Sequence, residues 1–409
     1  MARTILFIHQ NFPGQYRHLA PALQARGELV VAIGGPTARQ LPSIPLHRYN
    51  PMPAGGVPPC HDWVSDLQTK VLRAEAVGRC LEQLLGQGLR PDLIVGHPGW
   101  GELLAVKDLL PSVPVLHQVE FVYQLEGGDV GFDPEFGQPD WRNRARIRLR
   151  RSTQLLALQD LDWGLAPTPW QASTVPVEYQ PRLSVIHEGI DTAAITPRGP
   201  AEINLQRAGL NLRAGDEVIS FVARNLEPYR GFHRFMRALP LLQRLRPRAQ
   251  VLIVGGEEVS YGSAPAGGGT WKAALLKELE GQLDLSRVHF VGKIAHGLLH
   301  QLFRVCACHV YLTYPFVLSW SLLEAMASGA LVIGSATPPV QDVIHDGVNG
   351  RLVDFFDTEA LAHAIAAVLA DPAAQQPLRA QARRNVVERF DLQTVCLPQQ
   401  LDLVDRLLG

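Results

Sequence analysis

The residues best suited to ligand chemistry lie where a helix is expected to begin directly after a strand. Arg224 and Arg230 flank such a turn before the helix expected over His233–Leu245, and helix amides with two cations can bind a diphosphate. Glu324 lies in a helix expected after the strand Val310–Thr313, where a carboxylate can accept two hydrogen bonds from a ribose. The alternatives are a capped surface turn for the arginines and a solvated helix face for Glu324.

Two histidines in the first half follow apolar runs that predict strands. His97 follows the run that begins at Asp92, and His117 follows the run that begins at Val113. Ligands of parallel sheets collect beyond the carboxyl ends of the strands, so both side chains are candidates for a site. A hydrogen-bonded turn residue is the alternative for either histidine. Glu120 comes shortly after, in a segment with aromatic residues and a Gly-Gly pair.

The elements that must position these residues predict an α/β fold. A strand over Thr4–His9, a turn that contains Gly14, a helix to about Arg26 and a strand over Val30–Gly34 form the opening of a doubly wound parallel sheet. No G-x-G-x-x-G follows the first strand, which disfavours a dinucleotide-binding enzyme. Further apolar strands are expected in the second half over Glu217–Ala223, Val251–Gly255, Val288–Gly292 and Ala330–Gly334.

Composition excludes several classes of protein. The 409 residues favour two domains, and a net charge of −1 with 19% charged residues argues against a nucleic-acid-binding protein. No apolar run approaches the roughly 20 residues of a membrane span, and the N-terminal run lacks a signal-peptide cleavage site. The 5 cysteines are scattered, and none has a partner at zinc spacing, so we expect no metal site and a cytoplasmic protein with reduced thiols.

A run of arginines stands out between Arg142 and Arg151. If this run is helical, Arg142, Arg146 and Arg150 share one face. The first interpretation is a solvated helix. The alternative is a contact with an anionic lipid surface or a phosphate-bearing acceptor, which predicts a peripheral position at the inner face of the membrane.

The segment SLLEAMASGALVIGS, residues 321–335, resembles the donor-nucleotide segment of GT-B glycosyltransferases. It is similar to retaining glycosyltransferase family 4. The segment over residues 117–131 resembles a bacterial subgroup of that family, which implies that Glu120 lies on the acceptor side together with His97. The resemblance implies that Glu324 holds the nucleotide ribose. The preceding Glu of the family falls at Phe316 here, so we expect backbone amides of Val317 and Leu318 to hold the donor sugar, with the Phe316 ring as an apolar wall.

Other positions match the family one by one. Arg224 matches its Arg, and Arg230 stands where Lys is usual, which keeps the charge for the diphosphate. The resemblance further implies that Lys293 lies beside the nucleobase, that Gly14 lies beside donor phosphate and acceptor, and that His117 contacts the donor sugar. His97 is implied to lie near the cleft.

The resemblance implies two Rossmann-like domains that face a cleft. We expect an acceptor domain over residues 1–192, a linker over 192–215, a donor domain over 216–388 and a terminal helix over 391–408 that packs on the first domain. The expected reaction transfers a sugar from a UDP- or GDP-linked donor to a glycan, lipid-linked or small-molecule hydroxyl with retention, without a cofactor. The alternatives are a GT-B epimerase or phosphorylase, a catalytically silent sugar-nucleotide-binding subunit, and an inverting enzyme with Glu120 as its base.

Overall fold

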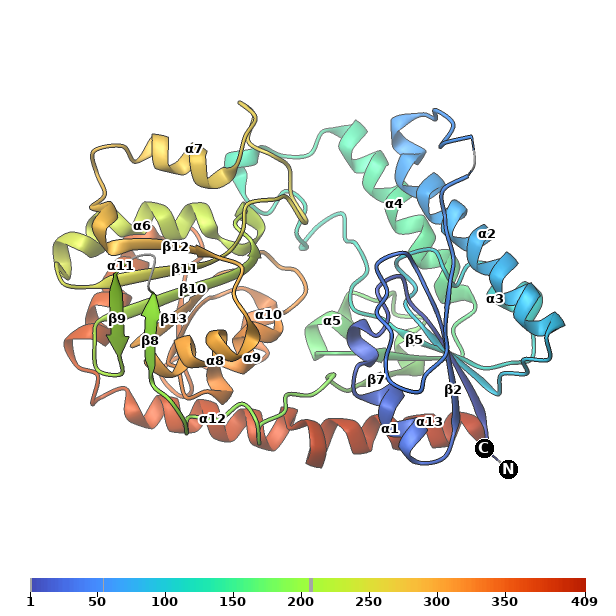
Figure 1. The fold of residues 1–409 in the computed structure, drawn as a ribbon. Helices are drawn as coiled ribbons and strands as arrows, with labels where there is room; N and C mark the ends of the chain where they lie inside the picture. Colours follow the sequence, from blue (N-terminus) through green and yellow to red (C-terminus); the bar gives the residue numbers. More distant parts are fainter. Residues whose placement is uncertain (1, 54, 206–208) are drawn as a thin grey trace. The chain divides into compact units, whose positions relative to one another are not determined.

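The chain divides into two compact units in the computed structural model, which describes residues 2–53, 55–205 and 209–409. The first unit comprises residues 1–189 and 393–409, and the second comprises residues 190–392. Each unit contains a parallel sheet with helices on its faces (Figure 1). The predicted α/β class with two parallel sheets is therefore confirmed.

The sheet of the first unit has the strand order β3-β2-β1-β4-β5-β6-β7, and every pair of neighbours is parallel. Its strands are β1 (Thr4–Ile8), β2 (Leu29–Gly34), β3 (Leu46–Arg48), β4 (Leu93–Gly96), β5 (Val115–Gln118), β6 (Trp163–Ala166) and β7 (Leu183–Val185). Its helices are α1 (Leu19–Ala25), α2 (Ser65–Gly86), α3 (Val106–Leu109), α4 (Trp141–Gln159), α5 (Pro169–Ser173) and α13 (Leu397–Leu408). The strand order reverses between β1 and β4, which is where ligands bind in doubly wound sheets.

Strand β1 shows why both faces of this sheet are covered. Its side chains alternate between the faces. Ile5 and Phe7 belong to a buried cluster that also contains Leu403 and Val404 of α13. The intervening residues of the strand belong to a second cluster with side chains of α2 and α3. The last helix of the chain therefore completes the core of the first unit.

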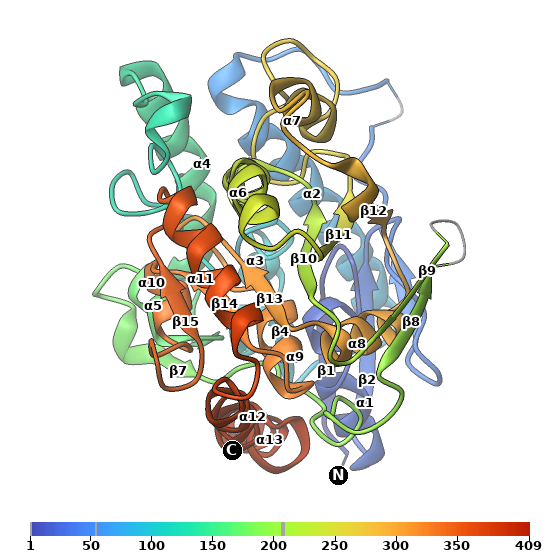
Figure 2. The same cartoon turned by 90° about the vertical axis from the view of Figure 1, so that its left-hand side faces the viewer.

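The sheet of the second unit has the order β12-β11-β10-β13-β14-β15 and is also parallel (Figure 2). Its strands are β10 (Val218–Asn225), β11 (Gln250–Gly256), β12 (Val288–Gly292), β13 (Cys308–Tyr311), β14 (Val332–Ser335) and β15 (Arg351–Val353). Its helices are α6 (Phe232–Leu245), α7 (Trp271–Glu278), α8 (His296–Val305), α9 (Trp320–Ala327), α10 (Pro338–Gln341), α11 (Thr358–Ala370) and α12 (Gln376–Phe390). Val218 lies in a cluster with α8, α9 and α12, whereas Phe221 stacks on Phe235 of α6 at 4.8 Å between ring centroids.

The prediction of a linker over residues 192–215 is wrong in part. Residues 202–205 and 210–213 form an antiparallel hairpin of β8 (Glu202–Leu205) and β9 (Leu210–Arg213), and the second unit already begins at residue 190 rather than 216. Ile203 and Leu212 of the hairpin are buried in the core of this unit. Residues 206–208 of the predicted linker lie outside the described residues. Each of these strands is too short for its alternation of apolar and polar residues to stand out from the neighbouring polar and glycine residues.

Candidate functional site

Three histidines of the first unit follow strands, and each accepts the same kind of local hydrogen bond. His9 follows β1, His97 follows β4 and His187 comes shortly after β7. In each case Nδ1 accepts a hydrogen bond from the backbone N–H two residues later, at 3.1, 2.9 and 3.0 Å respectively. Because Nδ1 is the acceptor, the neutral ring carries its proton on Nε2. The sheet therefore fixes both the orientation and the tautomer of these side chains.

Glu120 is held by three residues that follow other strands of the sheet, namely β1, β4 and β6. Its Oε2 atom lies 3.4 Å from His97 Nε2, and Gln15 Nε2 donates to its Oε1 atom. Gln171 donates to its backbone oxygen at 2.6 Å. Burial raises the pKa of the carboxyl, but the hydrogen bonds from His97 and Gln15 outweigh burial, and the pKa lies below its usual value. Glu120 is therefore an ionised group in a fixed position, in the region where we expected it together with His97.

His9 and Gly14 are in close contact. A Cβ atom at Gly14, where φ is +47°, would lie 2.9 Å from His9 Cε1, so the turn can pass the ring only with glycine. Burial, followed by the charge of His97, lowers the pKa of His9 to about 3. Its Nε2 atom is buried without a hydrogen-bond partner among the described residues. The sequence analysis missed His9, although it follows an apolar strand as His97 does.

His117 is a buried imidazole that makes no hydrogen bond to the described residues. It lies within β5 rather than at its end, with Gly96 and Gly164 opposite on the neighbouring strands. Only 1% of the residue is exposed, and neither ring nitrogen has a partner among the described residues. Burial lowers its pKa to about 4, against the opposing effect of Asp162. Buried polar atoms are nearly always paired, so both nitrogens suit a polar ligand or a water molecule.

In the second unit, Arg230 is a buried cation. It ends the short 3-10 helix η6 (Pro228–Arg230) and is 8% exposed. Its Nη1 atom donates to Tyr311 Oη at 3.3 Å, Thr313 Oγ1 at 3.0 Å and the Val317 carbonyl at 2.9 Å. Arg230 forms no ion pair with a carboxylate of the described residues. Its Nε and Nη2 atoms donate no hydrogen bond to any described residue. A buried charge in this state calls for an anion.

Glycine is required where α6 begins beside Arg230. Gly231 has φ of +67°, and a Cβ atom there would lie 2.3 Å from Leu312 Cβ. The chain therefore turns sharply between the arginine and the first residue of α6, Phe232. The amides of the first helical turn come directly after the buried guanidinium, as the diphosphate prediction requires.

Aromatic rings cover the Arg230 guanidinium. Its central carbon lies 5.4 Å from the Tyr261 ring and 5.8 Å from the Phe316 ring, and these rings are 4.9 Å apart. The buried Glu227 carboxylate accepts hydrogen bonds from the amides of Ser260, Tyr261 and Gly262 at 3.3, 3.1 and 3.1 Å, which holds Tyr261 in place. These hydrogen bonds anchor residues 260–262 to the segment that precedes Arg230.

Arg224 does not stand beside Arg230 in the turn. It lies in β10, its side chain is exposed, and it makes no hydrogen bond or ion pair with the described residues. Lys293 forms an ion pair with Glu258 at 2.6 Å, and the pKa of Glu258 is lowered first by that hydrogen bond and also by the charge of Arg224. Arg224 and Lys293 therefore form an exposed group around Glu258.

Glu324 lies in α9 and is 2% exposed. The helix starts at Ser319, whose side chain accepts from the amide of Ser321 and whose own amide donates to Tyr311 Oη at 2.8 Å. Tyr311 therefore links the start of α9 to Arg230. Phe316 and Leu318, in the preceding turn, are buried.

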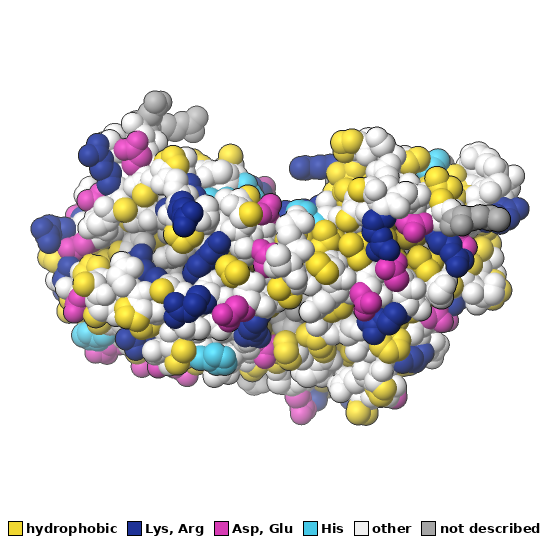
Figure 3. All heavy atoms as spheres, turned by 90° about the horizontal axis from the view of Figure 1, so that it is seen from below, with side chains coloured by type: hydrophobic (Ala, Val, Ile, Leu, Met, Phe, Trp, Pro, Cys, Tyr) yellow, Lys and Arg dark blue, Asp and Glu magenta, His cyan; other side chains and the backbone are white. Residues whose placement is uncertain are grey.

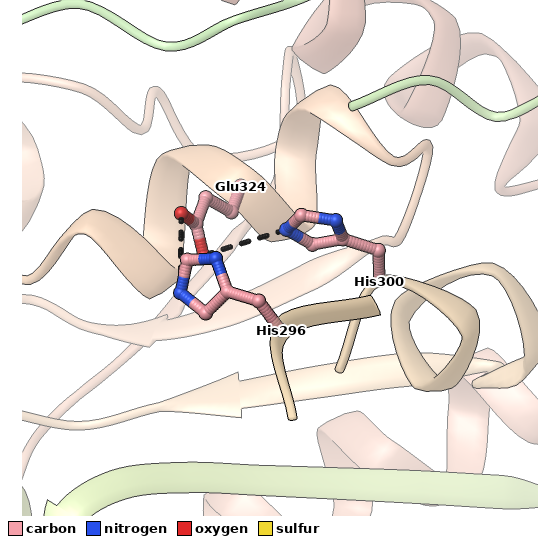
Figure 4. A group of neighbouring side chains, drawn as sticks. All are labelled: His296, His300 and Glu324. Carbon is pink, nitrogen blue, oxygen red and sulfur yellow. Dashed lines mark ion pairs between the residues drawn. The ribbon is translucent and has the colours of Figure 1, made fainter. Parts of the chain in front are cut away.

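The structure also brings two histidines of α8 to Glu324, which the sequence analysis missed. His296 Nε2 lies 4.0 Å from Glu324 Oε1, and His300 Nε2 lies 3.9 Å from Glu324 Oε2 (Figure 4). The available signal was the spacing of four between the two histidines, which places both on one face of a helix.

No helix in the described part of the chain is long and apolar enough to cross a membrane. Helix α4 contains all six arginines of the run from Arg142 to Arg151, of which Arg142, Arg146 and Arg150 were predicted to share one face. Arg144 pairs with Glu126 at 2.9 Å, and Arg142 lies over the ring of Trp141, which is 62% exposed. On the face that Figure 3 shows, Lys and Arg are interspersed with Asp and Glu.

Two family models match this chain. The model described as glycosyl transferase family 4 group matches residues 26–195, and the model described as glycosyl transferases group 1 matches residues 202–386. The chain belongs to glycosyltransferase family 4. The family predicted from residues 321–335 is therefore confirmed.

Curated relatives of this family 4 chain include two proteins named D-inositol 3-phosphate glycosyltransferase. That of Mycolicibacterium vanbaalenii is 33% identical over 195 residues, which cover 47% of this chain and 42% of the relative. That of Streptomyces coelicolor is 26% identical over 287 residues, which cover 66% of this chain and 58% of the relative. The matches thus span about half of the length of these relatives.

Solved structures with the same fold cover nearly the whole chain. Sucrose-phosphate synthase from Thermosynechococcus elongatus has a TM-score of 0.75 and 22% identity, and covers 99% of both chains. HepE from Anabaena, in complex with UDP-glucose, has a TM-score of 0.66 and 19% identity, and covers 98% of this chain and 99% of its own. These likenesses confirm the predicted GT-B fold.

The buried histidines predict a pH dependence of stability. Unfolded histidine titrates near pH 6.5, whereas folded His9 and His117 take up a proton only near pH 3 and 4. The unfolded chain binds more protons between these values, so the free energy of unfolding should fall as the pH falls from about 6.5 to 4. In urea titrations across this pH range, the free energy of unfolding of His117→Gln should fall less steeply with falling pH than that of the wild type. The exposed His61→Gln control should match wild type, and equal slopes in all three proteins would refute the explanation.

Proposed function

We propose that this protein transfers a sugar from a nucleotide-sugar donor to a hydroxyl acceptor with retention of the anomeric configuration. The observation that supports the proposal most strongly is Arg230, a buried cation at the start of α6 that pairs with no carboxylate in the described part of the chain. A nucleoside diphosphate is the anion that suits such a position, because helix amides and a guanidinium both bind its oxygens. A similar structure was solved with UDP-glucose, which supports a UDP- or GDP-linked donor.

The second unit binds the donor nucleotide in this proposal. Arg230 binds the diphosphate from the buried side, and Arg224 adds charge from the exposed side. Glu324 accepts hydrogen bonds from the ribose hydroxyls, and the segment around Lys293 borders the base. The amides of Val317 and Leu318 bind the sugar, and the Phe316 ring forms an apolar wall beside it.

The first unit binds the transferred sugar and the acceptor. His117 donates from its protonated ring nitrogen to a sugar hydroxyl, since it has no partner among the described residues. Gly14 lies beside the donor phosphate and the acceptor in this proposal, and its missing side chain lets the turn pass close to the His9 ring. His97 and Glu120, which face each other at 3.4 Å, bind the acceptor.

In the reaction, the bond between the anomeric carbon and the diphosphate oxygen breaks, and the diphosphate leaves with the electron pair. The acceptor oxygen forms its bond to the same face of the anomeric carbon, and its proton passes to the leaving phosphate oxygen. Negative charge grows on the diphosphate during this step, so Arg230 stabilises the transition state more than the ground state. The protein supplies the positive charge, and the proposal includes neither a metal ion nor a cofactor.

A second part of the proposal concerns α4. Trp141 and Phe136 are 62% and 47% exposed, and Arg142, Arg146 and Arg148 form no ion pair with the described residues. Exposed aromatic rings beside unpaired arginines are typical of surfaces that bind anionic lipid headgroups. We therefore propose that α4 binds the inner face of the cytoplasmic membrane, where a lipid-linked acceptor would be available.

The diphosphate site predicts a graded loss of nucleotide affinity. Arg230→Ala should weaken UDP or GDP binding by roughly 10- to 150-fold, because hydrogen bonds to charged groups contribute about 1.5–3 kcal/mol. Arg224→Ala should have a smaller effect, since solvent screens an exposed charge. Arg244→Ala, an exposed arginine of α6, is the control for isothermal calorimetry. Wild-type affinity in both the Arg230 and the Arg224 variant would contradict the site.

The Glu120→Gln variant distinguishes a retaining from an inverting mechanism. If no side chain removes the acceptor proton, Glu120→Gln should raise the KM for the acceptor or do little, with kcat mostly kept. Glu126→Gln, whose side chain is 81% exposed, controls for the loss of a carboxylate in the same segment. A fall in kcat of roughly two to four orders of magnitude, with an inverted anomeric centre in the NMR spectrum of the fresh product, would instead identify Glu120 as the base of an inverting enzyme.

The α4 surface predicts binding to anionic vesicles. The protein should sediment with phosphatidylglycerol vesicles but not with phosphatidylcholine vesicles, and added salt should release it. A triple change to Glu at Arg142, Arg146 and Arg148 should abolish sedimentation. Changing three exposed arginines elsewhere should not, and these controls are Arg39, Arg198 and Arg244. Equal sedimentation of both triple variants would exclude α4 as the contact.

A further inference from the structure

Three potential ligand groups converge in the second unit beside the proposed ribose site. His296 and His300 are four residues apart on α8, and Glu324 faces them from α9 (Figure 4). One ligand atom from each side chain lies within 4.8 Å of the other two. Two imidazoles and one carboxylate are therefore directed at a common point.

The ring nitrogens of His296 and His300 face the Glu324 carboxylate but do not hydrogen-bond to it. The two distances from His296 and His300 to the Glu324 oxygens, 4.0 and 3.9 Å, are too long for hydrogen bonds. The Nε2 atom of His300 is buried and has no hydrogen-bond partner among the described residues. Polar atoms that face each other at this separation are suited to an atom bound between them.

A divalent transition metal fits between these atoms. Zinc binds imidazole nitrogen and carboxylate oxygen at about 2.0–2.2 Å, which puts two ligand atoms of a tetrahedron about 3.4 Å apart. Each gap is therefore wider than required by roughly half an ångström. The side chain of His296 is 60% exposed and can rotate to close its gap, whereas His300 and Glu324 are largely buried and already aligned.

The chemical state of the ligands also suits a metal. Coordination requires a neutral imidazole and an ionised carboxylate, so a cationic neighbour that faced the ligands would oppose it. The Arg304 side chain is turned to the carbonyls of Pro200 and Thr196. Two histidines and one glutamate are a known zinc ligand set that leaves a fourth position open.

We propose that His296, His300 and Glu324 bind a divalent transition-metal ion such as Zn²⁺, and that the bound ion excludes the donor nucleotide. The exclusion rests on the proposed function, in which the Glu324 carboxylate holds the ribose. A carboxylate that coordinates zinc cannot also accept both ribose hydroxyls. The metal is therefore an inhibitor that competes with the donor and takes no part in the transfer.

The metal site is tested by titrating ZnCl2 into the full chain in a calorimeter. Wild type should bind one ion through this site, and His296→Ala and His300→Ala should each weaken it by more than about tenfold, the loss typical of removing even a supporting group. His363→Ala is the matched control, because His363 is 57% exposed and lies 3.8 Å from Glu359 on α11 without a third ligand. Circular dichroism checks the fold, and His296 is exposed enough for its variant to fold. Wild-type zinc binding in both His296→Ala and His300→Ala would overturn the site.

The exclusion is tested by measuring UDP and GDP affinity at a fixed, buffered concentration of free zinc. Diphosphates also bind zinc in solution, so His296→Ala reports that background. Zinc should weaken nucleotide binding in wild type by the factor one plus the ratio of free zinc to its Kd, and should weaken it much less in His296→Ala. Equal weakening in both would overturn the exclusion. Absence of UDP and GDP binding in zinc-free buffer would instead contradict the proposed function, and the zinc titration would still decide the metal site.

Discussion

A guanidinium group that is buried without a carboxylate partner is the constraint on which the donor site depends. Burying a charge is costly unless another charge compensates it. Among the described residues, the guanidinium of Arg230 contacts only carbonyl and hydroxyl oxygens and two aromatic rings. Several features maintain this state. Gly231 permits the sharp turn into α6, Glu227 holds Tyr261 over the guanidinium, and Tyr311 joins it to the start of α9. The turn that precedes the Glu324 helix is thus attached directly to the buried cation.

The buried polar side chains of the first unit are mostly neutral, in contrast to the buried cation of the second unit. Burial keeps His9 and His117 neutral, so these side chains offer directed hydrogen bonds without a charge. Glu120 is the ionised exception, because His97 and Gln15 stabilise its carboxylate. Neutral imidazoles suit uncharged sugar hydroxyls, whereas a cation suits a diphosphate, and each unit therefore has the electrostatics of the ligand part that we assign to it.

The sequence predicted the strands and helices well where apolar periodicity was strong, as at α9, and it singled out His97, His117, Arg230 and Glu324 as candidates. It ended β10 two residues early, at Ala223, because the strand continues past a register shift into the polar pair Arg224 and Asn225, which do not resemble a strand. The role of Glu227 could not be predicted, since its partner amides lie 33 to 35 residues later in the chain. The spacing of His296 and His300 was visible, but their approach to Glu324 depends on how α8 packs against α9.

A crystal structure with UDP or GDP tests the central claim most directly. The account predicts that a diphosphate oxygen lies about 2.7–2.9 Å from Nε or Nη2 of Arg230, the range of charge-assisted hydrogen bonds, with the first amides of α6 also donating to the diphosphate. The three hydrogen bonds of Nη1 should remain, because they hold the guanidinium in place. A diphosphate bound elsewhere, with Arg230 still without an anion, would contradict the account.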